Sequence, residues 1–149
     1  MSRLRRILHP SDFSRASGAA FKQAVQMAKV DRAQLLLVHV LAPPMPIAGE
    51  GYISPSVYKD LEASSRRYGQ KHLSALEAKA RKAGARALTL LLEGGLAHEQ
   101  IIRAARSKKA DLIVIGTHGR TGLAKFFLGS IASRVVAGAS CPVLTVRGR

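Results

Sequence analysis

Four residues between positions 116 and 130 have the types and the spacing of a phosphate-binding segment. Gly116, Gly119, Gly129 and Ser130 form the pattern G-x2-G-x9-G-S, which directly follows the apolar run at residues 112–115. Glycine lets backbone N–H groups approach phosphate oxygens because no Cβ stands in the way. A helix is expected to begin near Ser130, and the first N–H groups of a helix are unpaired and carry partial positive charge. The segment therefore predicts a site for the phosphate chain of a nucleotide.

This segment is not a Walker A loop, since neither Gly-Lys-Ser nor Gly-Lys-Thr occurs anywhere in the chain. Arg120 lies inside the segment, where it either adds positive charge to the phosphates or is solvated. The 5 histidines match no compact metal-ligand spacing, so no metal site made by the protein is expected. Mg²⁺ or Mn²⁺ held mainly through the phosphates is the expected ion.

Composition indicates a single α/β domain that spans residues 1–149. Of the 149 residues 47% are hydrophobic, and the chain contains no tryptophan and a single cysteine. This length supports one hydrophobic core. One cysteine cannot form an internal disulfide, which fits a reducing compartment. Because no apolar run approaches the roughly 18 residues of a membrane span, we expect a cytoplasmic protein without a membrane segment.

The charge balance is strongly positive, with 24 Lys and Arg against 9 Asp and Glu and a formal net charge of +15. A surface of this kind attracts polyanions through a salt-sensitive field, so association with nucleic acid stays open as an alternative. The basic residues are dispersed, mostly at helical spacing opposite apolar positions, as on solvated helix faces. They are not interleaved with the aromatic residues that single-strand binders use for base stacking. A solvated basic surface is therefore favoured over a dedicated nucleic-acid site.

Apolar periodicity and turn residues indicate five strands that alternate with helices. The strands are expected at residues 4–8, 34–40, 86–93, 111–116 and 142–146. A long helix is expected at 55–82, with Gly84 just beyond its end, and the last helix at 130–139. Strands that alternate with helices run parallel and are joined by right-handed crossovers. The chain is thus expected to form one doubly wound, five-stranded parallel sheet with helices on both faces.

In such a sheet, ligands bind outside the carboxyl ends of the strands, where the strand order reverses. Pro10, Ser11 and Asp12 follow the first expected strand, and Val40 ends the second. The glycine pattern follows the fourth. Asp12 is interpreted either as an N-cap of the first helix or as a ligand contact. Asp111 precedes its strand, at the edge away from this site, and is expected to be structural.

With these residues the chain resembles the universal stress proteins, in the branch of that family that binds ATP. The resemblance covers essentially the whole chain, from Ile-Leu-His-Pro-Ser-Asp-Phe-Ser at 7–14 to Cys-Pro-Val-Leu-Thr-Val at 141–146. Its most specific part is the glycine pattern. His9 departs from the family, which usually has a small apolar residue before the proline, and this departure bears on the shape of the adenine pocket.

The resemblance implies a role for each matched position. Asp12 would contact the ribose side of the nucleotide, with Pro10 and Ser11 lining the floor. Val40 would meet the adenine edge through its backbone. The phosphates would be surrounded by Gly116, Gly119, Gly129, Ser130 and the Ile131 amide. The resemblance also implies a homodimer, in which the apolar strand 142–146 pairs with its counterpart instead of remaining an open edge.

The glycine pattern and the resemblance together predict an ATP-binding universal stress protein with the strand order 3-2-1-4-5. It would act as a nucleotide-dependent stress-response switch, in which the phosphate chain of ATP, or else of ADP or AMP, orders the segment 116–129. Hydrolysis is expected to be slow or absent, because it needs acidic metal ligands and a residue that positions water. Asp12 is the one acidic residue expected near the site. Two alternatives stay open: an adenine-nucleotide hydrolase or transferase, and a basic protein that associates with nucleic acid.

Overall fold

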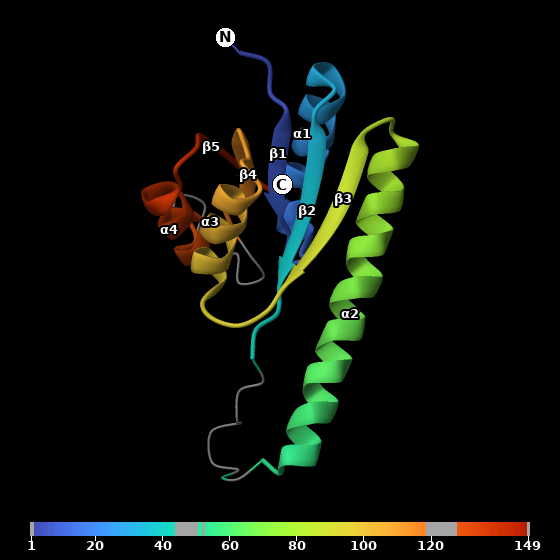
Figure 1. The fold of residues 1–149 in the computed structure, drawn as a ribbon, viewed down its shortest axis with the longest axis vertical. Helices are drawn as coiled ribbons and strands as arrows, with labels where there is room; N and C mark the ends of the chain where they lie inside the picture. Colours follow the sequence, from blue (N-terminus) through green and yellow to red (C-terminus); the bar gives the residue numbers. More distant parts are fainter. Residues whose placement is uncertain (1, 44–50, 52, 119–127, 149) are drawn as a thin grey trace.

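Five parallel strands form one sheet in the order β3-β2-β1-β4-β5, with helices on both of its faces (Figure 1). The structure is a computed structural model that describes residues 2–43, 51, 53–118 and 128–148. In chain order, the elements are β1 (Arg6–Pro10), α1 (Arg15–Asp31), β2 (Gln34–Val40), α2 (Pro55–Lys82), β3 (Arg86–Leu92), α3 (Ala97–Ser107), β4 (Leu112–Gly116), α4 (Ser130–Gly138) and β5 (Val143–Val146). The predicted doubly wound α/β fold is confirmed, strand order included.

Two helix layers cover the sheet because its strands carry apolar side chains on both faces. α1 and α2 pack on one face, where Leu35 and Leu37 of β2 lie buried. α3 and α4 pack on the other face, against Leu36 and Val38 of the same strand. Each helix follows the carboxyl end of a strand, so helix N-termini gather at the carboxyl edge of the sheet and helix C-termini at the amino edge.

Strand β1 begins and ends later than the sequence predicted, at Arg6–Pro10 rather than at residues 4–8. Its approach is held by side chains as well as by β2, whose Gln34 N–H donates to the Arg5 carbonyl at 2.8 Å. The Leu4 N–H donates to the Asp31 carboxylate at 3.0 Å, and the next two N–H groups donate to the Asp111 carboxylate at 2.8 and 2.9 Å. Pro10 still pairs in register with Val38 of β2. Asp111 is thus structural, as predicted.

The first helix is capped by Ser14 and not by Asp12. Ser14 Oγ accepts the N–H of Ser17 at 3.2 Å, which is the usual N-cap bond. Asp12 Oδ1 instead accepts the N–H of Ser14 at 2.9 Å, within the turn that leads into the helix. Asp12 is therefore placed in the turn itself, before the cap.

Helix α2 has 28 residues, and its first turns extend beyond the carboxyl edge of the sheet (Figure 1). Gly84, with a φ of +98°, follows its end as predicted. Gly69 lies where the helix comes closest to the sheet, since a Cβ there would stand 2.9 Å from Leu91 Cδ1 and 3.1 Å from His39 Cδ2. Neither α2 nor any other helix in the described ranges is long and apolar enough to cross a membrane.

Candidate nucleotide site

A cavity of about 300 Å³ opens at the carboxyl edge of the sheet, beside the point where the strand order reverses between β1 and β4. Its lining residues are Pro10, Ser11, Asp12, Ser17, Val38, His39, Val40, Ala97, Ile101, Ile115, Gly116, Thr117, His118, Gly129, Ser130, Ile131 and Ala132. Apolar side chains from β2, β4 and α3 face a small number of polar groups. This combination is typical of a site for a small organic ligand.

Every predicted site residue that the structure describes lines this cavity. These residues are Pro10, Ser11, Asp12, Val40, Gly116, Gly129, Ser130 and Ile131. Gly119 and Arg120 lie outside the described residues. The two groups that contribute most, the turn after β1 and the start of α4, are more than a hundred positions apart in the chain. They meet because β1 and β4 are neighbours in the sheet.

Thr117 and Gly129 hold the two ends of the glycine pattern together. The Gly129 N–H donates to the Thr117 carbonyl oxygen at 2.6 Å, and the Thr117 N–H donates to the Val146 carbonyl of β5 at 2.9 Å. A Cβ on Gly129 would stand 2.9 Å from that Thr117 oxygen, closer than real Cβ atoms come. We call this pair the Thr117–Gly129 clasp. Residue 129 must be glycine for the clasp to form, and its N–H is already bonded to Thr117. At this end of the glycine pattern, the N–H groups left for a ligand are therefore those of Ser130 and Ile131.

Helices α3 and α4 both begin at the cavity without a side-chain cap. Their N-cap residues are Leu96 and Gly129, and neither residue offers a side chain that could accept a cap hydrogen bond. The first hydrogen bond of α4 runs from the Ser133 N–H to Gly129 O at 2.9 Å, so the helix itself does not use the N–H groups of Ser130 and Ile131. Two such termini concentrate positive potential on the cavity, which suits an anion.

The turn between β1 and α1 holds Asp12 at the cavity. His39 Nδ1 lies 2.8 Å from the Ser11 carbonyl oxygen and donates to it. Phe13 adopts a φ of +63°, and the centre of its ring lies 4.3 Å from that of His39. A positive φ is unusual for a bulky residue and persists only where the surroundings hold it. The turn is therefore fixed on both sides of Asp12, so the backbone determines where the Asp12 carboxylate lies.

His9 is fully buried and compensates for the N–H that Pro10 lacks. The pairing of β1 with β4 ends at Leu8, and His9 Nδ1 donates to the Val114 carbonyl of β4 at 2.9 Å. Burial lowers the pKa of His9 from 6.5 to about 4, against the smaller raising effects of the Val114 hydrogen bond and the Asp12 charge. The imidazole is thus neutral near pH 7, and its Nε2 has no hydrogen-bond partner among the described residues. His9 therefore joins two strands and does not line the cavity.

Ser17, Thr117 and His118 also line the cavity, although they were not predicted to do so. Thr117 Oγ1 and His118 Nδ1 lie 2.9 Å apart. Ser17 Oγ donates to the Ser14 carbonyl at 2.8 Å and lies 3.2 Å from Ser11 Oγ. Thr117 and His118 could have been predicted, since both lie between two glycines of the pattern. Nothing in the sequence indicated Ser17. Among the described residues, no group of three or more His, Cys, Asp or Glu could hold a metal ion.

Comparison with known proteins gives matches along almost the whole chain. Residues 3–147 match the model of the universal stress protein family. The universal stress protein MJ0531 of Methanocaldococcus jannaschii is 37% identical over 145 residues, which cover 96% of this chain and 82% of that protein. Among solved structures, the universal stress protein UspA from Lactobacillus plantarum has a TM-score of 0.83 at 26% identity, covering 99% of this chain and 100% of that chain.

Some solved structures with the same fold contain an adenine nucleotide. The universal stress protein from Archaeoglobus fulgidus in complex with dAMP has a TM-score of 0.66 at 24% identity, covering 98% of this chain and 100% of that chain. Two more such structures, at 22% and 20% identity, are complexes with cAMP and with AMP. At these identities the likeness is one of fold. Together with the family model and the relative at 37% identity, it leads to one conclusion: this chain belongs to the universal stress protein family.

Proposed function

We propose that the protein binds an adenine nucleotide, with ATP and Mg²⁺ or Mn²⁺ as the working ligand, and acts as a nucleotide-dependent switch in the stress response. The observation that carries this proposal is the cavity at the carboxyl edge, where apolar walls, Asp12 and two uncapped helix N-termini meet. A base needs apolar walls, a ribose needs an acceptor for its hydroxyls, and phosphates need N–H groups in a positive potential. The dAMP, cAMP and AMP complexes of proteins with this fold support the same choice of ligand.

Each part of the nucleotide has residues that suit it. The adenine edge would meet the backbone of Val40 at the end of β2. The ribose hydroxyls would donate to Asp12, whose carboxylate is held in place by the Ser14 N–H. The phosphates would accept from the first-turn N–H groups of Ser130 and Ile131, beside Gly116. Gly119 and Arg120 are assigned to the phosphates from the glycine pattern alone.

The metal ion would be held mainly by the phosphates. Asp12 is the acidic residue among the described residues that line the cavity, and one carboxylate is too few for a metal site built by the protein. Mg²⁺ needs no such site, since it keeps several waters and binds through substrate phosphates. When bound, the ion neutralises charge on the phosphate chain. We expect hydrolysis to be slow or absent for the same reason, because phosphoryl transfer needs acidic metal ligands and a residue that orients water.

The switch would act through the segment 116–129, where contacts with phosphates change the surface that a partner recognises.

We also propose a homodimer that forms through β5. This strand is bonded on one side to β4, from Ile113↔Val143 to Gly116↔Val146, and it is the last strand of the sheet. A strand of four half-buried apolar and threonine residues at a sheet edge is a template for a second copy. The cytoplasm is the proposed compartment, because the single cysteine fits a reducing one.

Calorimetric titration tests the nucleotide site, with Mg-ATP, Mg-GTP and Mg-tripolyphosphate added to protein that has been unfolded and refolded to remove bound nucleotide. We expect binding of ATP in clear preference to the other two. Asp12→Asn should weaken ATP by about tenfold or more, since it removes a charged acceptor worth about 1.5–3 kcal/mol. The same variant should leave tripolyphosphate unchanged. Equal, salt-sensitive binding of all three ligands would refute the proposal.

A matched pair of glycine variants separates the phosphate site from general stability. Gly129→Ala places a Cβ 2.9 Å from a backbone oxygen and must displace the clasp and the start of α4. Gly18→Ala adds the same methyl group in α1, where nothing lies within 4 Å. We expect loss of ATP binding in the first variant and wild-type affinity in the second. Wild-type affinity in both would show that the start of α4 does not hold the phosphates.

Trypsin reports on the switch, because Arg120 and Lys125 are cleavage sites within the segment. Saturating Mg-ATP should slow cleavage after these residues, and an unchanged rate would refute the switch.

Light scattering at several protein concentrations tests the homodimer. Thr145→Lys places charge on the edge strand and should shift the mass to that of a monomer. A wild-type protein that is monomeric at high concentration would refute the dimer.

A further inference from the structure

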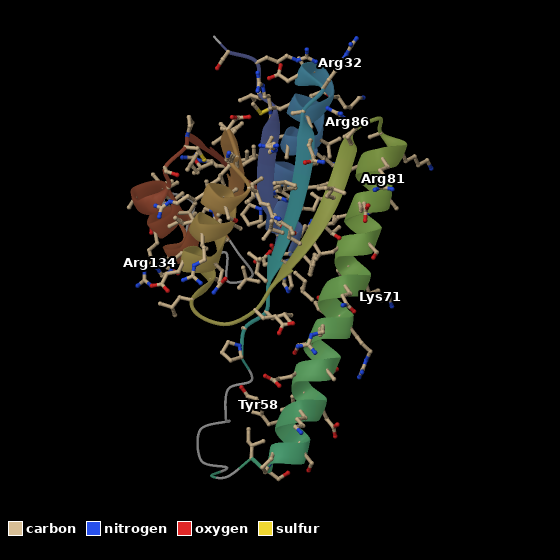
Figure 2. The ribbon with its side chains drawn as sticks, in the orientation of Figure 1. Arg32, Tyr58, Lys71, Arg81, Arg86 and Arg134 are labelled. Atoms are coloured by element: carbon tan, nitrogen blue, oxygen red, sulfur yellow. The ribbon has the colours of Figure 1, made fainter. Side chains whose placement is uncertain are left out.

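Six exposed basic residues lie together at the amino edge of the sheet, opposite the nucleotide cavity. We propose that this surface binds the phosphate backbone of nucleic acid, independently of the nucleotide. The members of this amino-edge cluster are Arg5, Arg6, Arg32, Arg86, Lys108 and Lys109. They come from the starts of β1 and β3 and from the C-terminal ends of α1 and α3. Figure 2 shows Arg32 and Arg86 at one end of the molecule, far along the axis from the first turns of α2.

Backbone contacts show that the cluster is continuous across neighbouring strands. The Arg5 carbonyl accepts the N–H of Gln34 at 2.8 Å, which places the start of β1 beside Arg32 and β2. Gln34 is in turn paired in register with Arg86, the first residue of β3. On the other side, the Arg6 carbonyl accepts the N–H of Asp111 at 2.9 Å, which follows Lys108 and Lys109 closely in the chain.

The width of the cluster fits several phosphates. It spans the four adjacent strands β3, β2, β1 and β4, and neighbouring strands lie about 4.8 Å apart, so it extends over about 14 Å. Duplex DNA carries one charge per about 1.7 Å of its axis, hence about eight charges over this length, of which one side of the duplex presents roughly half. A contact with about four phosphates is therefore the geometric expectation.

Acidic side chains offset only part of the charge of the cluster, since two carboxylates face six cations. The carboxylates of Asp31 and Asp111 lie at this edge, and both accept backbone N–H groups of the chain that leads into β1. Among the described residues, ion pairs join Arg66 to Glu93 and Arg81 to Glu77, so neither pair involves a residue of the cluster. The net positive charge at this edge is thus available to a partner.

Helix C-termini explain part of the cluster but not its centre. Cations near a helix C-terminus stabilise the helix, and Arg86 donates to the Arg32 carbonyl at the end of α1. Lys108 is the C-cap residue of α3, which it caps through its backbone N–H. Arg5 and Arg6, however, stand at the start of the central strand and do not belong to the end of a helix. No aromatic residue belongs to the cluster, so recognition would use phosphates and not bases, and it would not depend on sequence.

Fluorescence anisotropy with a labelled 20-base-pair duplex tests the proposal over a range of KCl concentrations. For about four phosphate contacts, the logarithm of the association constant should fall with the logarithm of salt with a slope of about −3.6. The test variant is Arg5→Gln/Arg32→Asn/Lys109→Asn. Asparagine is chosen because Arg32 and Lys109 both have a φ of +54°, which asparagine tolerates well. Its slope should be less steep by about 2–3, and its affinity near 0.1 M salt at least about tenfold lower.

The matched control is Lys59→Gln/Arg67→Gln/Lys71→Gln, which removes three charges from the exposed face of α2. Figure 2 labels Lys71 on this helix, away from Arg32. Both variants lower the formal net charge of +15 by three. We expect the control to bind the duplex like the wild type. Equal weakening in both variants would overturn the proposal, because the whole charge and not the amino-edge cluster would then drive binding.

Two further arms keep the proposal distinct from the nucleotide function and from other partners. Saturating Mg-ATP should leave duplex affinity unchanged, whereas competition would place the duplex at the nucleotide cavity and overturn the proposal. Sedimentation with vesicles of phosphatidylserine and phosphatidylcholine should show weaker binding to the vesicles than to the duplex. The reverse order would assign the cluster to membranes.

Acetylation of lysines tests the site in the wild-type protein, so its result does not depend on whether a variant folds. The bound duplex should protect Lys108 and Lys109 from acetylation but not Lys71, and equal protection would refute the site.

Discussion

Replacing His9 should remove much of the acid sensitivity of folding, because this imidazole is buried and neutral. Its pKa is about 4 in the folded protein, against 6.5 for an exposed histidine. Between these two values the unfolded chain binds a proton that the folded protein excludes, so stability falls as the pH falls. The contribution of His9 is complete above pH 6.5 and is lost as the pH approaches about 4.

The size of the effect follows from the two pKa values. A shift of this size corresponds to about 3 kcal/mol over the full range, at about 1.4 kcal/mol for each pKa unit. Between pH 7 and pH 5, His9 accounts for a loss of about 2 kcal/mol in the free energy of unfolding. His9→Asn is the informative change because the asparagine amide nitrogen, like Nδ1, is bonded to Cγ and can still donate to Val114. His9→Leu also removes the donor and should lose a further ~1–3 kcal/mol at every pH.

Urea unfolding followed by circular dichroism, at pH 7 and at pH 5, measures the difference. The wild-type protein should lose about 2 kcal/mol more than His9→Asn between these two pH values. Any cost of the smaller side chain is the same at both pH values and cancels, and the remaining histidines are common to both proteins. If the two proteins lose the same free energy within about 0.5 kcal/mol, His9 does not stay neutral in the folded state and the reasoning fails.

Three other substitutions test capping and packing. Asp111→Ala should lower the free energy of unfolding in urea by about 1–2 kcal/mol, since it removes the acceptor of two backbone N–H groups before β1. Calorimetry should show unchanged ATP affinity in that variant, and a loss would contradict the separation of the two sheet edges. Gly69→Ala should cost up to about 1 kcal/mol, because its Cβ would stand 3.1 Å from the His39 ring, which is bonded to the Ser11 carbonyl, as well as 2.9 Å from the end of the Leu91 side chain. A stabilised protein would contradict this. Ser14→Ala should cost about 1 kcal/mol through the lost cap of α1, and an unchanged Tm would argue against that cap.

The layered fold could be predicted because its signal is local. Buried parallel strands such as β2 are continuous apolar runs, and Gly84 marks the end of α2. The order of the strands has no local signal, since the sequence of β5 does not indicate that it lies beside β4. That part of the prediction depended on the resemblance to a family. Strand ends were harder to place, because Pro10 pairs with β2 although it lacks an N–H.

The candidate site could be predicted wherever a backbone requirement leaves a mark in residue type. Gly129 is such a case, since the clasp admits no side chain there. Ser17 is the opposite case, because a serine in a first helical turn serves many roles and only the fold brings it to the cavity. The partner of His9 could not be foreseen either. Val114 is 105 positions away, and a hydrogen bond between them depends on which strands are neighbours.

The Thr117–Gly129 clasp also connects the edge strand β5 to the start of α4 through the backbone. The Val146 carbonyl of β5 accepts the Thr117 N–H, and the Thr117 carbonyl accepts the Gly129 N–H, so two consecutive hydrogen bonds join the strand to the helix. A displacement of β5 would therefore be passed to the first turn of α4, which lines the cavity. In the proposed homodimer, pairing of β5 with a second copy would be coupled to the nucleotide cavity by this route.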